Sequence, residues 1–203
     1  MNDIQRSLDV AFRDCLGVRP HETVLVVTDD ERAVLGATFH QAAGRYAQAA
    51  LLAVMPVRDN NGQEPPPAVA AMMLHADAIF LVTTKSLSHT QARQRATARG
   101  ARIASLPGAT AGMIRRAMAV DHQQLKALCA RIIPILSNAR AVRIATAAGT
   151  DLVFSLKGRK AHPDHGIIRE RGGFTNLPAG EVYVAPLEGT ASGRVVIDGS
   201  VLQ

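Results

Sequence analysis

The chain has 203 residues, of which 47% are hydrophobic and 20% are charged, a composition typical of a globular protein and not of a disordered one. Its formal net charge is +6, but the basic residues are scattered and only 3% of the residues are aromatic, so a stacking platform for nucleic acid is not expected. No apolar run approaches the roughly 18 residues that a membrane span needs. The first residues lack a basic n-region followed by an apolar h-region, so we do not expect a secretory signal. We therefore expect a cytoplasmic protein without a membrane or nucleic-acid partner.

Short apolar runs alternate with segments of helical periodicity up to Leu106. The apolar runs are Val24–Val27, Leu51–Met55, Ala78–Val82 and Arg102–Leu106. Continuous apolar character is typical of strands that are covered on both faces in a parallel sheet. The pattern predicts an α/β fold with a doubly wound, mostly parallel sheet of the Rossmann or flavodoxin type.

Four helices are expected between and around these strands. The first spans Asp3–Leu16, and the second carries an apolar stripe that includes Leu35 and Phe39. The third begins at Pro65–Pro67, because proline is tolerated in the first turn of a helix. The fourth spans Thr90–Arg99.

The pattern changes after Asp121, where a helix with an apolar stripe is expected and Pro134 should bend it or shorten its last turn. Beyond Asn138 the sequence predicts strands. They are a hairpin of Val142–Thr146 with Asp151–Leu156, followed by Val182–Val184 and Arg194–Ile197.

We place a domain boundary near residue 138. Residues 1–138 would form the α/β domain, and residues 139–203 would begin a β-rich domain that looks truncated, since about 65 residues are marginal for an independent core. Unpaired strands in this incomplete domain should promote association. Two cysteines, Cys15 and Cys129, lie far apart in helical segments, which indicates small core residues in a reducing compartment.

Several common catalytic motifs are absent from the sequence. It contains no G-x-S-x-G elbow, no G-x-x-x-x-G-K-[ST] loop, no H-E-x-x-H helix and no G-x-G-x-x-G after the first strand. The loop Thr83–Thr90 could cradle an anion with its hydroxyls, Lys85 and a helix N-terminus. A helix capped by Ser88 or Thr90 would explain the same residues without a ligand.

The cluster His162-Pro163-Asp164-His165 contains two imidazoles and a carboxylate that could bind zinc or iron. No further ligand follows nearby, and Lys157, Arg159 and Lys160 would repel a cation. A solvent-exposed loop is therefore the favoured interpretation of His162, Asp164 and His165.

Glu181 is the strongest candidate metal ligand. A turn made by Pro178 and Gly180 delivers its carboxylate to the start of an apolar strand, and a carboxylate held by rigid backbone suits a hard or borderline divalent cation. The alternative is a surface carboxylate at a strand end, as we expect for Glu188 and Asp198. No catalytic residue can be assigned.

Several segments together resemble a known family. They are Thr83–Arg93, Gly100–Gly108, Ala148–Leu152, Gly158–Lys160, Asn176–Pro186, Glu188–Ala191 and Val196–Ser200. These stretches are similar to the N-terminal portion of the thermophilic-type metallo-aminopeptidases, the aminopeptidase T and aminopeptidase S family that is often labelled leucyl aminopeptidase. The resemblance covers essentially the whole chain, and Asn176–Pro186 is its most specific part.

The resemblance implies a homodimeric hydrolase, a metalloprotease that releases N-terminal amino acids from peptides with two divalent metal ions (Zn, Co, Mn or Mg). Its first metal-binding carboxylate falls on Glu181, while a second glutamate, two histidines and an aspartate fall beyond residue 203. The paired metals would activate a bridging water. With most ligands absent, the isolated chain is expected to be inactive or nearly so.

Two other functional classes stay open. The family has non-haem iron relatives that cleave the ring of dihydroxypyridines, and their metal ligands would also fall beyond this chain. A non-catalytic fragment that serves dimerisation or binding is the third possibility.

Overall fold

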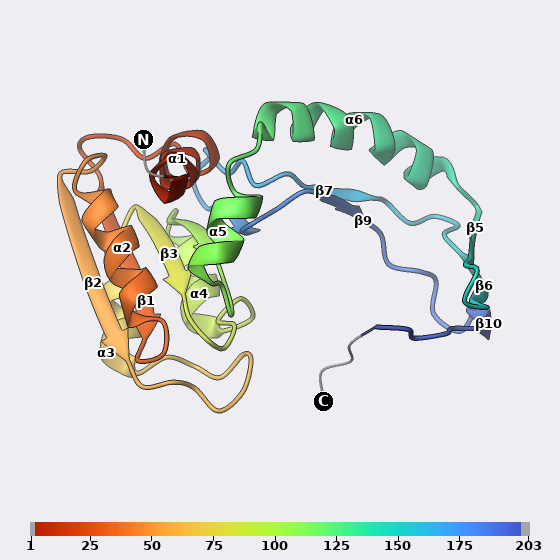
Figure 1. Cartoon of the computed structure of the whole chain (residues 1–203), viewed down its shortest axis with the longest axis horizontal. Helices are drawn as coiled ribbons and strands as arrows, with labels where there is room; N and C mark the ends of the chain where they lie inside the picture. Colours follow the sequence, from red (N-terminus) through yellow and green to blue (C-terminus); the bar gives the residue numbers. More distant parts are fainter. Residues whose placement is uncertain (1–2, 200–203) are drawn as a thin grey trace. The chain divides into compact units, whose positions relative to one another are not determined.

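The computed structural model describes residues 3–199, and contacts between Cα atoms divide the chain into two compact units (Figure 1). Unit 1 consists of Met1–His122 and Gly166–Ala179, and unit 2 consists of Gln123–His165 and Gly180–Gln203. The division differs from a single boundary near residue 138, because a later segment returns to unit 1. The assignment of residues 1–138 and 139–203 to two domains stays a prediction.

Unit 1 is built on a five-stranded, wholly parallel sheet, which confirms the predicted fold class. Its order is β2-β1-β3-β4-β8. The strands are β1 (Thr23–Asp29), β2 (Ala49–Met55), β3 (Ala78–Val82), β4 (Arg102–Ser105) and β8 (Phe174–Asn176). The first three predicted apolar runs lie within β1, β2 and β3, and the fourth, Arg102–Leu106, extends one residue beyond the end of β4.

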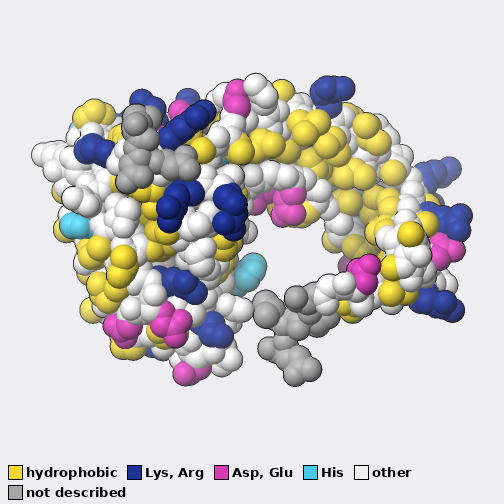
Figure 2. Space-filling view, in the orientation of Figure 1, with side chains coloured by type: hydrophobic (Ala, Val, Ile, Leu, Met, Phe, Trp, Pro, Cys, Tyr) yellow, Lys and Arg dark blue, Asp and Glu magenta, His cyan; other side chains and the backbone are white. Residues whose placement is uncertain are grey.

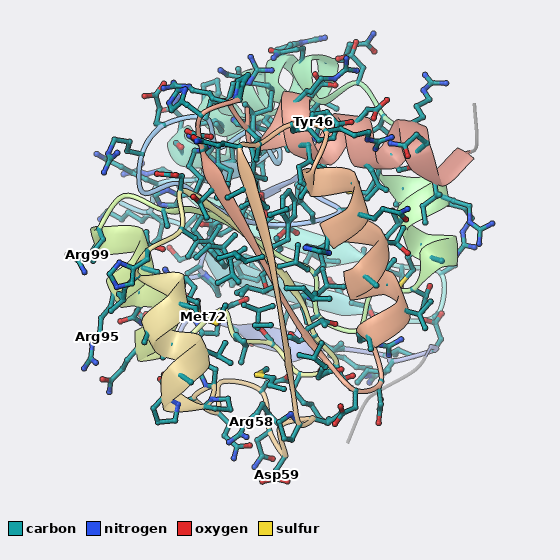
Figure 3. The ribbon with its side chains drawn as sticks, turned by 90° about the vertical axis from the view of Figure 1, so that its left-hand side faces the viewer. Tyr46, Arg58, Asp59, Met72, Arg95 and Arg99 are labelled. Atoms are coloured by element: carbon teal, nitrogen blue, oxygen red, sulfur yellow. The ribbon has the colours of Figure 1, made fainter. Side chains whose placement is uncertain are left out.

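The strands β1, β3 and β4 are buried along almost their whole length because helices cover both faces of the sheet. Along β1, Val24 and Val26 belong to one buried cluster while Leu25 and Val27 belong to the other. Figure 3 shows α3 and α4 on one side of the sheet and α2 on the other. The helices of unit 1 are α1 (Asp3–Asp9), η1 (Val10–Cys15, a π-helix), α2 (Ala33–Ala43), α3 (Pro67–Met73), α4 (Gln91–Ala98) and α5 (Ala111–Ala117).

Aromatic side chains fill the centre of one cluster. The ring of Phe12, on η1, lies 4.5 Å from that of Phe80 on β3 and 4.9 Å from that of Tyr46. Cys15 is fully buried on the same helix, as predicted, and burial raises the pKa of its thiol to about 12. Gly17 follows with φ of 58°, a conformation that favours glycine and ends the helix.

The local sequence pattern does not predict the strand β8. Its three residues extend the sheet beyond β4, with Ala104 opposite Thr175. The segment contains Gly172, Gly173 and polar residues instead of an apolar run. Gly172 has φ of +75°, and a Cβ there would lie 3.0 Å from the carbonyl oxygen of Thr97, so the close approach of this loop to α4 requires glycine.

Unit 2 contains most of the helix α6 (His122–Asn138) and a three-stranded antiparallel sheet of order β10-β6-β5. The hairpin of β5 (Ala141–Ala145) and β6 (Asp151–Ser155) confirms the predicted one. The helix continues past Pro134 to Asn138, so the proline does not end it. Cys129 on this helix is 4% exposed.

Two expectations for unit 2 are wrong. The third strand of the sheet, β10, spans Ser192–Arg194 and not Arg194–Ile197, and Ile197 is 65% exposed. The segment His162–Asp164, which was expected to be a loop, is the strand β7 and pairs antiparallel with β9 (Glu181–Tyr183).

Several large apolar side chains of unit 2 are exposed, and Figure 2 shows hydrophobic atoms along α6. Leu128 and Ile135 on that helix are 49% and 67% exposed. Among residues 3–199, no helix combines the length and the apolar character that crossing a membrane demands.

Candidate functional site

In unit 1, polar side chains gather where the parallel strands end. The order β2-β1-β3 reverses direction between β1 and β3, and such a switch point is where doubly wound sheets usually bind ligands. Here Asp29, the last residue of β1, is 1% exposed. Its carboxylate accepts hydrogen bonds from the backbone N–H of Thr84 (2.5 Å), the Thr84 hydroxyl (2.9 Å) and the N–H of Arg32 (3.1 Å). The switch point is thus bridged by the protein's own groups.

A second set of hydroxyls lies at the ends of β4 and β8. The hydroxyl of Ser88 donates to that of Ser105 at 2.9 Å and lies 3.4 Å from Oδ1 of Asn176. Arg93 donates from Nε to the carbonyl oxygen of Ser88 at 2.7 Å, and its guanidinium lies 4.4 Å from the centre of the Phe174 ring. These contacts hold the Thr83–Thr90 loop against the returning strand.

The predicted anion cradle at the start of α4 is filled by a side chain of the protein. The Glu64 carboxylate accepts hydrogen bonds from the N–H groups of Gln91 (2.5 Å) and Ala92 (3.1 Å). The hydroxyl of Thr90 accepts from the N–H of Arg93 at 3.2 Å, so Thr90 is the cap that the sequence analysis proposed as the alternative. Since these donors are satisfied internally, the loop shows a capped helix and not an open anion site.

Unit 2 brings together two candidate metal-binding segments, His162–Asp164 and Glu181–Tyr183, which lie apart in the sequence. In the β7–β9 ladder, Asp164 stands directly opposite Glu181, and His162 stands directly opposite Tyr183. Opposite residues, and residues two apart on one strand, project to the same face of a sheet. His162, Asp164, Glu181 and Tyr183 therefore share one face, which we call the β7–β9 face.

The β7–β9 face is open to solvent. Glu181 and Tyr183 are exposed and Asp164 is half-buried. The rings of His162 and Tyr183 stack with their centres 5.7 Å apart. The thiol of Cys129 donates to the carbonyl oxygen of Glu181 at 3.5 Å, which ties β9 to α6. Two carboxylates in one cross-strand pair repel each other, and a bound cation would relieve this repulsion.

The donors on this face suit part of a metal site. Oxygen ligands and an imidazole are suitable for iron and other divalent metals. Within residues 3–199, however, no three His, Cys, Asp or Glu side chains come together in a way that could hold a metal ion. His165 is half-buried next to Asp164 but does not complete a site. Glu188 pairs with Arg159, as expected of a surface carboxylate.

Fold and site together define an α/β protein that carries a paired-carboxylate face on a second, β-rich unit. A family model described as "NicX: 2,5-dihydroxypyridine 5,6-dioxygenase" matches residues 4–201. The chain therefore belongs to this family. A comparison with curated proteins found no match.

Two solved structures share the fold. A 2,5-dihydroxypyridine dioxygenase from Pseudomonas putida KT2440 is 18% identical with a TM-score of 0.74, and the match covers 95% of this chain and 59% of that one. Wild-type AmpT from Thermus thermophilus is 16% identical with a TM-score of 0.54, and the match covers 94% of this chain and 63% of that one. This chain thus spans less than two thirds of the length of either protein.

These findings correct the expected function. The family match overturns the resemblance to the metallo-aminopeptidases, and with it the aminopeptidase, hydrolase and protease activity and the peptide substrate. The dihydroxypyridine dioxygenase, the first of the two other functional classes, agrees with the family match. The error has a physical basis, because the fold of this chain resembles both solved structures and a shared fold does not determine the reaction.

Proposed function

We propose that this chain forms part of a ring-cleaving dioxygenase that acts on a dihydroxypyridine. The match of the family model over residues 4–201 carries the proposal. The higher TM-score to the dioxygenase than to AmpT, 0.74 against 0.54, agrees with it at the level of fold. The reaction named by the family inserts both atoms of dioxygen while the bond between ring carbons 5 and 6 breaks.

The contribution of this chain to metal binding would be the carboxylate pair. Glu181 is the proposed ligand of a divalent metal, iron in a dioxygenase, and Asp164 is its cross-strand neighbour. The donors in residues 3–199 fit one side of such a site and not a whole site, so we derive no catalytic step through the metal from them. The remaining donors would have to come from other residues.

The aromatic pair on the same face is placed to contact a flat ring. Residues two apart on a strand are separated by about 7 Å, so the stacked rings of His162 and Tyr183 lie beside the carboxylate pair. Tyr183 is 54% exposed and could offer its ring to a pyridine. The face would then bind the metal at one end and orient the substrate at the other.

The test measures two reactions with each chain as the enzyme. The chain of 203 residues and any longer product that its gene encodes are each supplied with ferrous iron and air. One assay follows loss of 2,5-dihydroxypyridine with oxygen uptake, and the other follows release of the chromophore from a leucine anilide. We expect equimolar loss of pyridine and oxygen with the longer product and little or none with the 203-residue chain.

One outcome would contradict the proposed reaction, and a second would contradict only the incompleteness of the metal site. Hydrolysis of the leucine anilide without loss of the pyridine would favour peptidase chemistry. Full ring cleavage by the 203-residue chain would show that its donors are sufficient, against the incomplete site described above.

A further inference from the structure

A charged cavity of about 310 Å³ lies in unit 1 at the amino ends of the parallel strands. Its walls come from the loop before β1, from the residues that precede β3 and β4, and from the loop before β8. This edge of the sheet is opposite to the carboxyl ends, where the hydroxyl clusters lie. The volume is at the lower end of the range of small-molecule sites.

One wall of the cavity contains a buried arginine with an unused donor. Arg102, the first residue of β4, is 3% exposed. Its Nη1 and Nη2 donate to the two carboxylate oxygens of Glu22 at 3.0 and 2.5 Å. Its Nε is also buried and has no hydrogen-bond acceptor among the residues that the structure describes. Buried donors are rarely left without an acceptor, so Arg102 keeps a hydrogen-bonding capacity that Glu22 does not fill.

Three more arginines line the cavity, and the backbone holds two of them in place. Arg169 donates from Nε to the carbonyl oxygen of Asp14 at 3.2 Å, and Arg171 donates from Nη2 to that of Arg99 at 3.1 Å. Bonds to carbonyl oxygens orient a guanidinium without neutralising its charge. Within residues 3–199, neither these two arginines nor Arg19 forms an ion pair with a carboxylate.

A glycine makes room for one of these guanidinium groups. Gly100 also lines the cavity and has φ of +105°. A Cβ at this position would lie 2.4 Å from Nη2 of Arg171. The positive φ favours glycine at this position, and the absence of a side chain there leaves the space that the Arg171 guanidinium occupies.

The balance of charge in the cavity favours an anion. Four arginines and His21 face three carboxylates, of which Glu22 is already paired with Arg102 and Asp77 accepts a hydrogen bond from the N–H of Thr23. We propose that this cavity binds a small oxyanion, a phosphate or carboxylate group, through Arg102, Arg169 and Arg171. Planar guanidinium groups bind such oxygens with paired hydrogen bonds. The site is independent of the proposed dioxygenase function.

The experiment is calorimetric titration of the 203-residue chain with inorganic phosphate and, separately, with succinate. The double variant Arg169→Gln/Arg171→Gln should weaken binding by roughly tenfold or more, because two charged donors are lost. The control Arg115→Gln/Arg116→Gln removes the same charge from exposed positions of α5 outside the cavity and should change affinity less than about twofold. Tighter binding of phosphate or of succinate identifies which oxyanion the cavity prefers.

A third variant keeps the proposal testable if the double variant fails to fold. Glu170 lines the cavity and is exposed, so Glu170→Gln removes a negative charge without disturbing the core. It should strengthen binding of the preferred anion by roughly two- to fivefold. Absence of a binding signal for both anions, or equal affinities in Glu170→Gln and the natural chain, would overturn the proposal.

Discussion

Asp164 and Glu181 stand directly opposite each other on two antiparallel strands of three residues each. Each residue alone is an exposed or half-buried acid of the kind found on any protein surface. Together they form a pair of like charges on one face, beside a stacked histidine and tyrosine. Because the strands pair in this register, the side-chain oxygens that could bind a cation come from both strands.

The first prediction concerns metal binding by this pair. We expect Glu181→Gln to weaken the binding of Mn²⁺ or Fe²⁺ to the 203-residue chain by at least about tenfold, because an amide oxygen replaces a charged ligand. Asp164→Asn should have a similar effect. Electron paramagnetic resonance of free Mn²⁺ measures the affinity of each variant for this ion.

A matched control is Glu188→Gln, which removes the same charge from an exposed carboxylate that pairs with Arg159 and not with β7. Its affinity for Mn²⁺ should equal that of the natural chain. Equal affinities for Glu181→Gln and Glu188→Gln would show that Glu181 is only a surface acid.

The sequence predicted the central sheet because its first four strands are apolar and lie between helices. It did not predict β7 or β8, which have three residues each and contain proline or polar residues. Such short strands form because distant partners are available, β9 for one and β4 for the other. Local pattern contains no information on these partners. Glu181 was therefore found as a single candidate, while Asp164 and His162 were assigned to a loop.

The second prediction concerns the bridge at the switch point of the sheet. Asp29→Asn should lower the free energy of unfolding by about 1–3 kcal/mol, because the buried carboxylate accepts three hydrogen bonds from Thr84 and Arg32. Urea denaturation measures the change. The neighbouring Asp30 is exposed, and Asp30→Asn should change the same quantity by less than about 0.5 kcal/mol. Equal effects of both substitutions would contradict a role of the bridge in stability.

The third prediction is a pH dependence that arises from the buried pair of Glu22 and Arg102, whose side chains are 7% and 4% exposed. Burial raises the pKa of Glu22, but hydrogen bonds from Arg102 and from the N–H of Arg19 outweigh it, and the pKa lies below the ordinary value of 4.5. A lowered pKa in the folded state means that the ionised carboxylate stabilises the protein above that value. This contribution is lost as the pH falls below about 4.5 toward the folded-state pKa.

The variant Glu22→Gln tests this dependence. At pH 7 it should lower the free energy of unfolding by about 3–5 kcal/mol, because Arg102 is left buried without its counter-charge. The difference from the natural chain should shrink as the pH falls below about 4.5, since protonated glutamate resembles glutamine. A difference that stays constant down to pH 3 would contradict the assignment to Glu22.

The last prediction concerns association through the apolar side chains of α6. Leu128 and Ile135 are seven residues apart and so lie on one face of the helix, and they are 49% and 67% exposed. Burying an isoleucine contributes about 1.5–3 kcal/mol, so contact between copies through this face would favour a dimer or a larger assembly. Ile135→Lys should weaken association roughly tenfold or more, as measured by light scattering over a range of concentrations.

Ala130, which is exposed and lies on the opposite face of α6, provides the control, and Ala130→Lys should leave association unchanged. If the natural chain is a monomer at every concentration, the exposed face of α6 does not drive contact between copies.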